Sequence, residues 1–136
     1  MILAQVPPEE IEEAWSIAAP LLAPAIEMGE EMSLEQALEH CHTRNMQLWL
    51  VAEDDNTLLG VFTTRLVEVE NAKHCYVMHL GGKDMRKWGK EVTDLLAEWA
   101  KEAGCTKLLS QGRKGTERMY KDFGWEFDSV RMKRTL

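Results

Sequence analysis

The chain has 136 residues, 45% hydrophobic and 29% charged, and these values are typical of one globular domain that spans residues 1–136. The formal net charge of -7 disfavours general nucleic-acid binding. No apolar run approaches the roughly 18–20 residues that a membrane span needs, and the N-terminus lacks the pattern of a secretory signal, so we expect a cytoplasmic protein.

The first part of the chain predicts one strand and then helices. The elements expected here are a strand over residues 2–6 and helices over 8–22 and 33–44. Pro20 and Pro24 should break the first helix, because proline lacks the N–H that a helix interior needs. Ser33 and Gln36 have the spacing of a capping box and predict where the second helix begins.

After residue 46 the apolar period changes from about 3.6 to 2, which indicates strands. Strands are expected over residues 47–53, 58–70 and 73–80, joined as an antiparallel meander. A long amphipathic helix follows, with apolar residues on one face from Met85 to Ala103 and Gly104 suited to its C-terminal end.

The last expected elements are a strand over residues 105–111, a helix over 115–122, and a final strand or hairpin within 125–136. The order is therefore β-α-α-β-β-β-α-β-α-β(-β). This order predicts an α/β (α+β) fold with a mixed, mostly antiparallel sheet of about six to seven strands and helices on both faces.

The stretch "LGGKD" leaves an apolar strand and leads into the long helix. Free N–H groups and the helix dipole attract anions at such a helix start. Gly81 and Gly82 would let the backbone approach a ligand closely, and Lys83, Arg86 and Lys87 would add positive charge. The pattern predicts a phosphate cradle, and a plain strand-to-helix turn is the alternative.

The position of the helix start is open between two registers. If the helix begins near Asp84, Gly89 lies inside its first turns and the paired glycines form the functional turn. If it begins near Trp88, Gly89 lies in the binding loop and Glu91 places a like charge near the phosphates. The apolar face begins at Met85, which favours the first register.

Residues 80–109 and the segment "RMYKDFGW" resemble the GCN5-related N-acetyltransferase (GNAT) superfamily. That family has Arg/Gln-x-x-Gly-x-Gly/Ala at a helix start and Tyr-x-x-Leu-Gly-Phe after a later helix. Here "RKWGKE" supplies Arg86 and Gly89, and "YKDFGW" supplies Tyr120, Gly124 and Trp125. A looser likeness is to the short GNAT-like proteins of bacteriophage and prophage genomes, which share the Gly-Gly-basic-acid-Met run.

The resemblance implies transfer of an acetyl group from acetyl-CoA, the expected cosubstrate, to an amine. The cofactor-binding residues expected on this basis are Leu80, Gly81, Gly82, Lys83, Arg86, Lys87, Trp88, Gly89, Arg113 and Lys114. Tyr120 matches the family position that often serves as the acid for the leaving thiolate. His79 is the first candidate for the base; the fallbacks are His74, Glu68 and Glu70.

The expected acceptor is an amine on a small molecule or on a protein. Residues 1–43 contain nine acidic side chains and no Lys or Arg, and in the family's fold this region borders the acceptor side. Such a border favours a cationic amine. The alternative is a non-enzymatic protein of the same fold, phage-encoded and serving as a binding or virion-associated module, with a degenerate cofactor site.

No metal site and no disulfide framework are expected. His40 and His42 are two residues apart on a helix and point to different faces, which does not suit a shared metal. The chain has three widely spaced cysteines, an odd number that is typical of a reducing compartment. A homodimer is compatible with the sequence.

Overall fold

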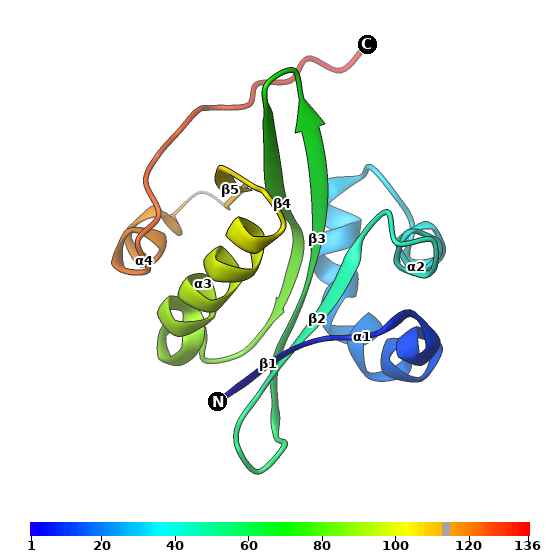
Figure 1. Cartoon of the computed structure of the whole chain (residues 1–136). Coiled ribbons are helices and arrows are strands. Elements are labelled where there is room, and N and C mark those ends of the chain that lie inside the picture. Colours follow the sequence, from blue (N-terminus) through cyan, green and yellow to red (C-terminus); the bar gives the residue numbers. More distant parts are fainter. Residues whose placement is uncertain (113–114) are drawn as a thin grey trace.

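The sheet has five strands in the order β1-β2-β3-β4-β5, which is also their order along the chain. The computed structural model describes residues 1–112 and 115–136. The strands are β1 (Ile2–Gln5), β2 (Gln47–Ala52), β3 (Leu58–Val69), β4 (Ala72–Gly82) and β5 (Lys107–Ser110). The helices are the 3-10 turn η1 (Pro8–Glu10), α1 (Ile11–Gly29), α2 (Leu34–His42), α3 (Met85–Glu102) and α4 (Glu117–Asp122). Neighbours from β1 to β4 pair antiparallel, whereas β4 and β5 pair parallel (Figure 1).

Helices cover both faces of the sheet, with α1 and α2 on one face and α3 and α4 on the other (Figure 1). Side chains alternate between the faces along each strand, so one strand contributes to two cores. Ile11, Leu22 and Leu48 belong to the core under α1 and α2. Phe62 and Leu96 belong to the core under α3. The mixed, mostly antiparallel sheet with helices on both faces confirms the expected fold class.

The expectation of six to seven strands is wrong, because the described residues form five. Residues 125–136 form neither strand nor helix. Apolar and charged residues alternate there as in a strand, but a strand also needs a partner for its backbone groups. This C-terminal tail leaves the sheet instead, and it exposes Phe127, Val130 and Met132 to solvent.

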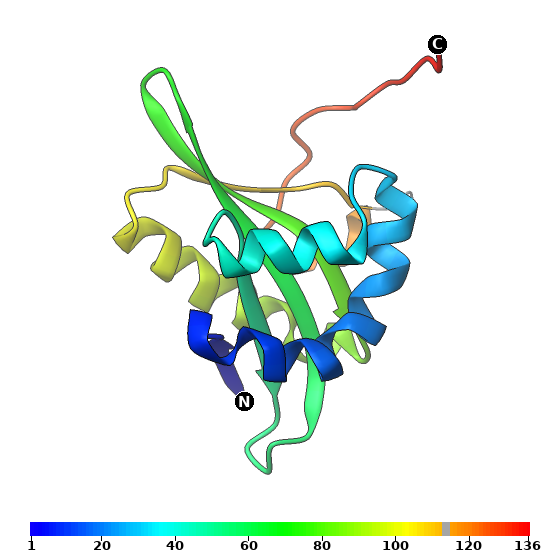
Figure 2. The same ribbon diagram turned by 90° about the vertical axis from the view of Figure 1, so that its right-hand side faces the viewer.

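The prediction that Pro20 and Pro24 end the first helix is also wrong, because α1 continues through both to Gly29. The two prolines are four residues apart, and both are exposed on the solvent side of the helix. The opposite side carries Ala18, Leu22 and Ile26, which are buried against the sheet. Tertiary packing of this face therefore maintains the helix. The prolines bend α1 without ending it (Figure 2).

Two local expectations on helix ends are confirmed. The Ser33 hydroxyl accepts a hydrogen bond from the Gln36 N–H at 3.1 Å, and the Gln36 amide oxygen accepts one from the Ser33 N–H at 2.9 Å. Gly104 follows α3 with a positive φ of 91°, as a glycine that ends a helix does. A pair of hydrogen bonds therefore marks the start of α2, and the backbone conformation of a glycine marks the end of α3.

Candidate active site

The parallel pairing of β4 and β5 stops early and leaves a split in the sheet. The last pair is Val77 with Ser110, and among the described residues no strand pairs with residues 78–82 on that edge. A bulge lies at the same point, because Thr63 pairs with His79 while its neighbour Thr64 pairs with Val77. Met78 is the extra residue, and a bulge of this kind bends its strand. Nothing in the sequence pattern predicted this bulge.

The split leads to the N-terminus of α3, which has free backbone donors. In the part of the chain that the structure describes, the N–H groups of Asp84, Met85 and Arg86 have no hydrogen-bond partner. The flanking N–H groups are used, since Lys83 donates to the Leu59 carbonyl at 2.9 Å and Lys87 donates to the Asp84 carbonyl at 2.8 Å. Three adjacent free donors at the positive end of a helix dipole are an arrangement that suits an anion.

Three positive side chains flank these donors along the chain, next to the carboxylate of Asp84 itself. Lys83, Arg86 and Lys87 are exposed. Arg86 lies 3.6 Å from Asp122 of α4, whereas neither lysine has an ion-pair partner among the residues described. Glu91 lies one turn further along α3 than Lys87. The lysines are therefore available to an anion at the helix start.

The helix register is the first of the two alternatives, since α3 begins at Met85 with Asp84 as its N-cap. The paired glycines are the last two residues of β4 rather than a loop. A Cβ on Gly81 would lie 1.9 Å from the Leu21 carbonyl oxygen of α1, and a Cβ on Gly82 would lie 2.5 Å from the Leu59 carbonyl oxygen. Both glycines therefore allow close backbone packing, and the free donors begin two residues later.

Gly89 and Trp88 also have packing roles. A Cβ on Gly89 would lie 2.3 Å from the Phe123 ring, so this glycine lets α4 approach α3. Trp88 is buried, and its indole Nε1 donates to the Lys83 carbonyl at 2.7 Å. That bond orients the backbone just before the free donors. Trp88 thus lies beside the candidate site and forms part of its wall.

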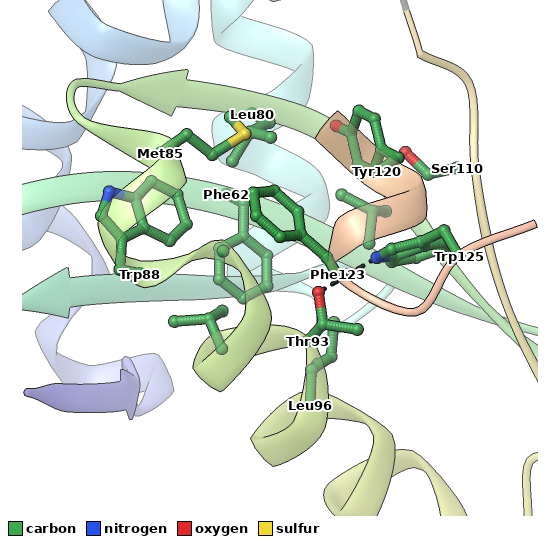
Figure 3. Close-up of a pocket in the computed structure, with 13 residues that line it drawn as sticks. Phe62, Leu80, Met85, Trp88, Thr93, Leu96, Ser110, Tyr120, Phe123 and Trp125 are labelled. Carbon is green, nitrogen blue, oxygen red and sulfur yellow. Dashed lines mark hydrogen bonds between the residues drawn. The ribbon is translucent and has the colours of Figure 1, made fainter. Parts of the chain in front are cut away.

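A small apolar cavity of about 40 Å³ lies between β4, α3 and α4 (Figure 3). Leu80, Met85 and Trp88 line one end, and Tyr120 and Trp125 line the other. The cavity can hold one or two water molecules or a small group, but not a long arm. An extended ligand would therefore have to follow the open edge of β4.

Tyr120 is half-buried on this face of the sheet and stacks edge-on against Phe123 and Trp125, with ring centroids 6.2 and 5.8 Å away. Burial raises the pKa of the Tyr120 phenol, and a hydrogen bond with Ser110 offsets part of this effect. The phenol therefore remains protonated at neutral pH. It lies next to the residue at which the split begins, and it can donate a proton there.

His79 lies on the other face of the sheet, on the side of α1 and α2. Its cross-strand partner is Thr63, and the His79 Nδ1 is 3.0 Å from the Thr63 hydroxyl. Within the described residues the His79 Nε2 has no hydrogen-bond partner. Every fully buried side-chain nitrogen or oxygen described there has a partner, so the Nε2 is not fully buried and reaches solvent. Burial lowers the pKa of His79, and the nearby charge of Glu31 raises it by a smaller amount. The imidazole is therefore neutral at pH 7 and can accept a proton.

The other candidates lie away from the split. His74, Glu68 and Glu70 are near the turn of the β3–β4 hairpin, on the side where β4 is still paired with β5. Arg113 and Lys114 lie outside the described residues. In the described part of the chain no group of three or more His, Cys, Asp or Glu side chains could hold a metal ion. No helix described there is both long enough and apolar enough to cross a bilayer.

Solved acetyltransferases have the same fold. An aminoglycoside acetyltransferase, meta-AAC0020 from an uncultured soil metagenomic sample, in complex with sisomicin, matches with a TM-score of 0.70 at 16% identity, over 99% of this chain and 95% of that chain. Glucosamine-6-phosphate N-acetyltransferase from Arabidopsis thaliana matches with a TM-score of 0.68 at 14% identity, over 98% and 97%. A predicted acetyltransferase from Clostridium acetobutylicum, with acetyl-CoA, matches with a TM-score of 0.68 at 13% identity, over 98% and 95%.

No protein-family model matches this sequence, and the comparison with curated proteins gives no match. The structural likeness extends over nearly the whole chain, but the identities are low. It shows that the chain has the fold of the GNAT acetyltransferases. The fold alone does not determine the reaction, which has to be argued from the site.

Proposed function

We propose that this chain is an N-acyltransferase that moves an acetyl group from acetyl-CoA to an amine. The observation that carries the proposal is the split between β4 and β5, which leads to three free N–H groups at the start of α3. A ligand that reached both features would end between Tyr120 on one face of the sheet and His79 on the other. These two groups can move the protons that acyl transfer requires.

The described residues fit the anionic and the extended parts of acetyl-CoA. The N–H groups of Asp84, Met85 and Arg86 would hold the diphosphate, and Lys83 and Lys87 would balance its charge. The unpaired edge of β4 over residues 78–82 offers backbone groups to an extended arm, as it would to a strand. When bound, acetyl-CoA supplies a thioester whose carbonyl carbon accepts the amine nitrogen.

The side chains divide the proton transfers between the two faces. The reacting nitrogen attacks in its uncharged form, after its first proton has passed to solvent; the neutral imidazole of His79 takes the second proton as the new bond forms, and Thr63 keeps the ring oriented. The phenol of Tyr120 gives a proton to the leaving sulfur. Main-chain N–H groups of β4 that face the split next to the Met78 bulge would stabilise the negative charge that develops on the thioester oxygen.

The acceptor in this proposal is a cationic amine, on a small molecule or on a protein lysine, and it approaches from the side of α1 and α2. His79 faces that side, and the acidic residues before position 44 lie on or near it. A reducing, cytoplasmic setting is part of the proposal and agrees with the free, buried state of Cys41, Cys75 and Cys105. A homodimer stays a prediction.

One observation favours a second candidate, a non-enzymatic protein of this fold. The apolar cavity beside Tyr120 measures only about 40 Å³, and Phe123 closes it against Gly89. Such a protein, phage-encoded or not, would use the scaffold for binding without transfer. It would bind acetyl-CoA weakly or not at all, and it would not release coenzyme A in the presence of amines.

Calorimetry with acetyl-CoA tests the cofactor site, with two variants that make the same charge change on one helix. Lys87→Glu should weaken binding about tenfold, because it replaces a cation beside the phosphates with an anion. Lys101→Glu, in the last turn of α3, is the control and should bind as the wild type does. Equal affinities for the two variants would place the diphosphate elsewhere, and no binding by the wild type at millimolar acetyl-CoA would favour the second candidate.

A further inference from the structure

The C-terminal tail crosses from one face of the sheet to the other. At its start, the Trp125 indole Nε1 donates to the Thr93 hydroxyl of α3 at 3.0 Å. Further on, Arg131 bonds to Glu31 in the loop between α1 and α2, and these two helices cover the opposite face (Figure 1). The Arg131 Nη2 is 2.7 Å from the Glu31 carboxylate, and its Nη1 is 3.3 Å from the Gln111 side-chain oxygen.

Arg131 bridges the two sides of the split. Gln111 directly follows β5, next to Ser110, at which pairing with β4 ends. Glu31 lies close enough to His79 to act on its pKa. The guanidinium is therefore held on the face of the sheet where the amine is proposed to enter, and it is held by a carboxylate that acts on the proposed base.

The tail has little else to hold it there. From Glu126 to Leu136 every residue is exposed, and in the described part of the chain Arg131 makes the only side-chain bonds of this segment. The ion pair is itself open to water, since the Arg131 and Glu31 side chains are 64% and 49% exposed. Exposed ion pairs of this kind are weak, so a competing cation can displace this one.

We propose that Arg131, held on the tail, occupies the binding position of the positively charged part of the amine, and that Glu31 selects for amines with such a charge. The tail is then a strap across the acceptor side of the split. A cationic amine takes the place of Arg131 on Glu31, near His79, and releases the strap. This inference rests on the proposed function and adds how its acceptor side is guarded.

Amide ¹⁵N relaxation of tail residues 129–133 tests the displacement, with spermidine as the probe cation and no acetyl-CoA present. In the wild type, spermidine should increase the mobility of these residues, whereas sodium chloride at the same ionic strength should not. In Arg131→Gln the tail should be mobile from the start. Lys133→Gln makes the same charge change on the same tail, and because Lys133 has no partner among the described residues it should behave as the wild type.

Spermidine affinity gives the second measurement. Arg131→Gln should bind spermidine roughly two- to fivefold more tightly than Lys133→Gln, which is the range that an exposed ion pair allows. Glu31→Gln should weaken binding and cancel the effect of Arg131→Gln. Equal affinities for Arg131→Gln and Lys133→Gln, or equal release by sodium chloride, would overturn the inference. Since neither measurement needs acetyl-CoA, failure to bind acetyl-CoA would contradict the proposed function separately.

Discussion

Tyr120 and His79 differ in protonation at neutral pH because the ordinary pKa values, 10.0 for the phenol and 6.5 for the imidazole, lie on opposite sides of pH 7, and burial widens this difference. Burial disfavours the charged form of any group, so it raises the pKa of the phenol and lowers the pKa of the imidazole. The phenol therefore keeps its proton and the imidazole lacks one. An acid and a base of this kind, on opposite faces of a split sheet, suit a reaction in which one group gains a proton and another loses one.

Replacement of Tyr120 tests the acid. Tyr120→Phe should lower kcat by about 10² or more, because the phenol proton is lost while the ring contacts with Phe123 and Trp125 remain. Affinity for acetyl-CoA should stay within about twofold, since a hydroxyl that acts on the leaving sulfur adds little to binding. Tyr76→Phe, on the paired part of β4, is the matched control and should keep full activity. An unchanged kcat in Tyr120→Phe would remove this residue from the mechanism.

The pH profile tests the base. The pKa of His79 lies below its ordinary value of 6.5, so kcat/KM should be level above pH 6.5 and should fall as His79 becomes protonated at lower pH. Stability should decrease in the same direction, because below pH 6.5 the unfolded chain binds a proton that the folded His79 resists. His79→Gln should lose most of the activity and the acid limb attributed to His79. An acid limb that persists in this variant would assign the base to another group.

At the scale of elements, the contact between α3 and α4 depends on Gly89. The ring of Phe123 occupies the place where a larger residue would put its Cβ, and Phe123 is itself buried. Gly89→Ala should therefore destabilise the fold by about 1–3 kcal/mol, even though alanine favours helices. Gly29→Ala is the control, since nothing lies within 4 Å of its Cβ, and it should be neutral or slightly stabilising. Thermal unfolding of both variants gives the comparison, and equal midpoints would show that α4 can shift at no cost.

Local signals predicted most of the elements. The Ser33–Gln36 capping box fixed the start of α2, and the apolar face that begins at Met85 favoured the observed register of α3. Each of these signals depends on residues within one or two turns, so the sequence contains it in full. The continuation of α1 through Pro20 was not predictable in this way, because it depends on burial against the sheet.

The anion site stays a prediction, and the structure corrects the role that the sequence indicated for two of its residues. The sequence indicated an anion site between β4 and α3, yet it assigned the close approach of the backbone to Gly81 and Gly82. In the structure these glycines make room for Leu21 and the Leu59 carbonyl. The β4 bulge depends on pairing with β3. The path of the tail depends on the bond between Arg131 and Glu31, which are 100 residues apart in the chain. Such long-range features have no local signal.

At the scale of the whole molecule, the sheet brings together two oppositely charged parts of the chain. Residues 1–43 contain no Lys or Arg, and residues 83–134 contain thirteen. The acidic part forms the α1 and α2 side, and Lys83, Arg86 and Lys87 mark the start of α3. The split therefore lies between the α1 and α2 side, which suits cations, and the start of α3, which suits anions. A polyanionic acyl donor and a cationic acceptor would be drawn to different sides of it.

The stabilisation of the folded state by ligands should show whether the start of α3 binds the anionic part of the acyl donor. Acetyl-CoA at about 100 times its dissociation constant should stabilise the folded state by about 2.7 kcal/mol, seen as a rise of several degrees in the unfolding midpoint. S-acetylpantetheine at the same concentration should give a much smaller rise, because it keeps the thioester and the arm but lacks the diphosphate. Lys87→Glu should reduce the rise with acetyl-CoA, while Lys101→Glu should not. If both compounds stabilise the wild type equally, the free N–H groups of Asp84, Met85 and Arg86 do not hold the diphosphate, and binding must come from the strand edge alone.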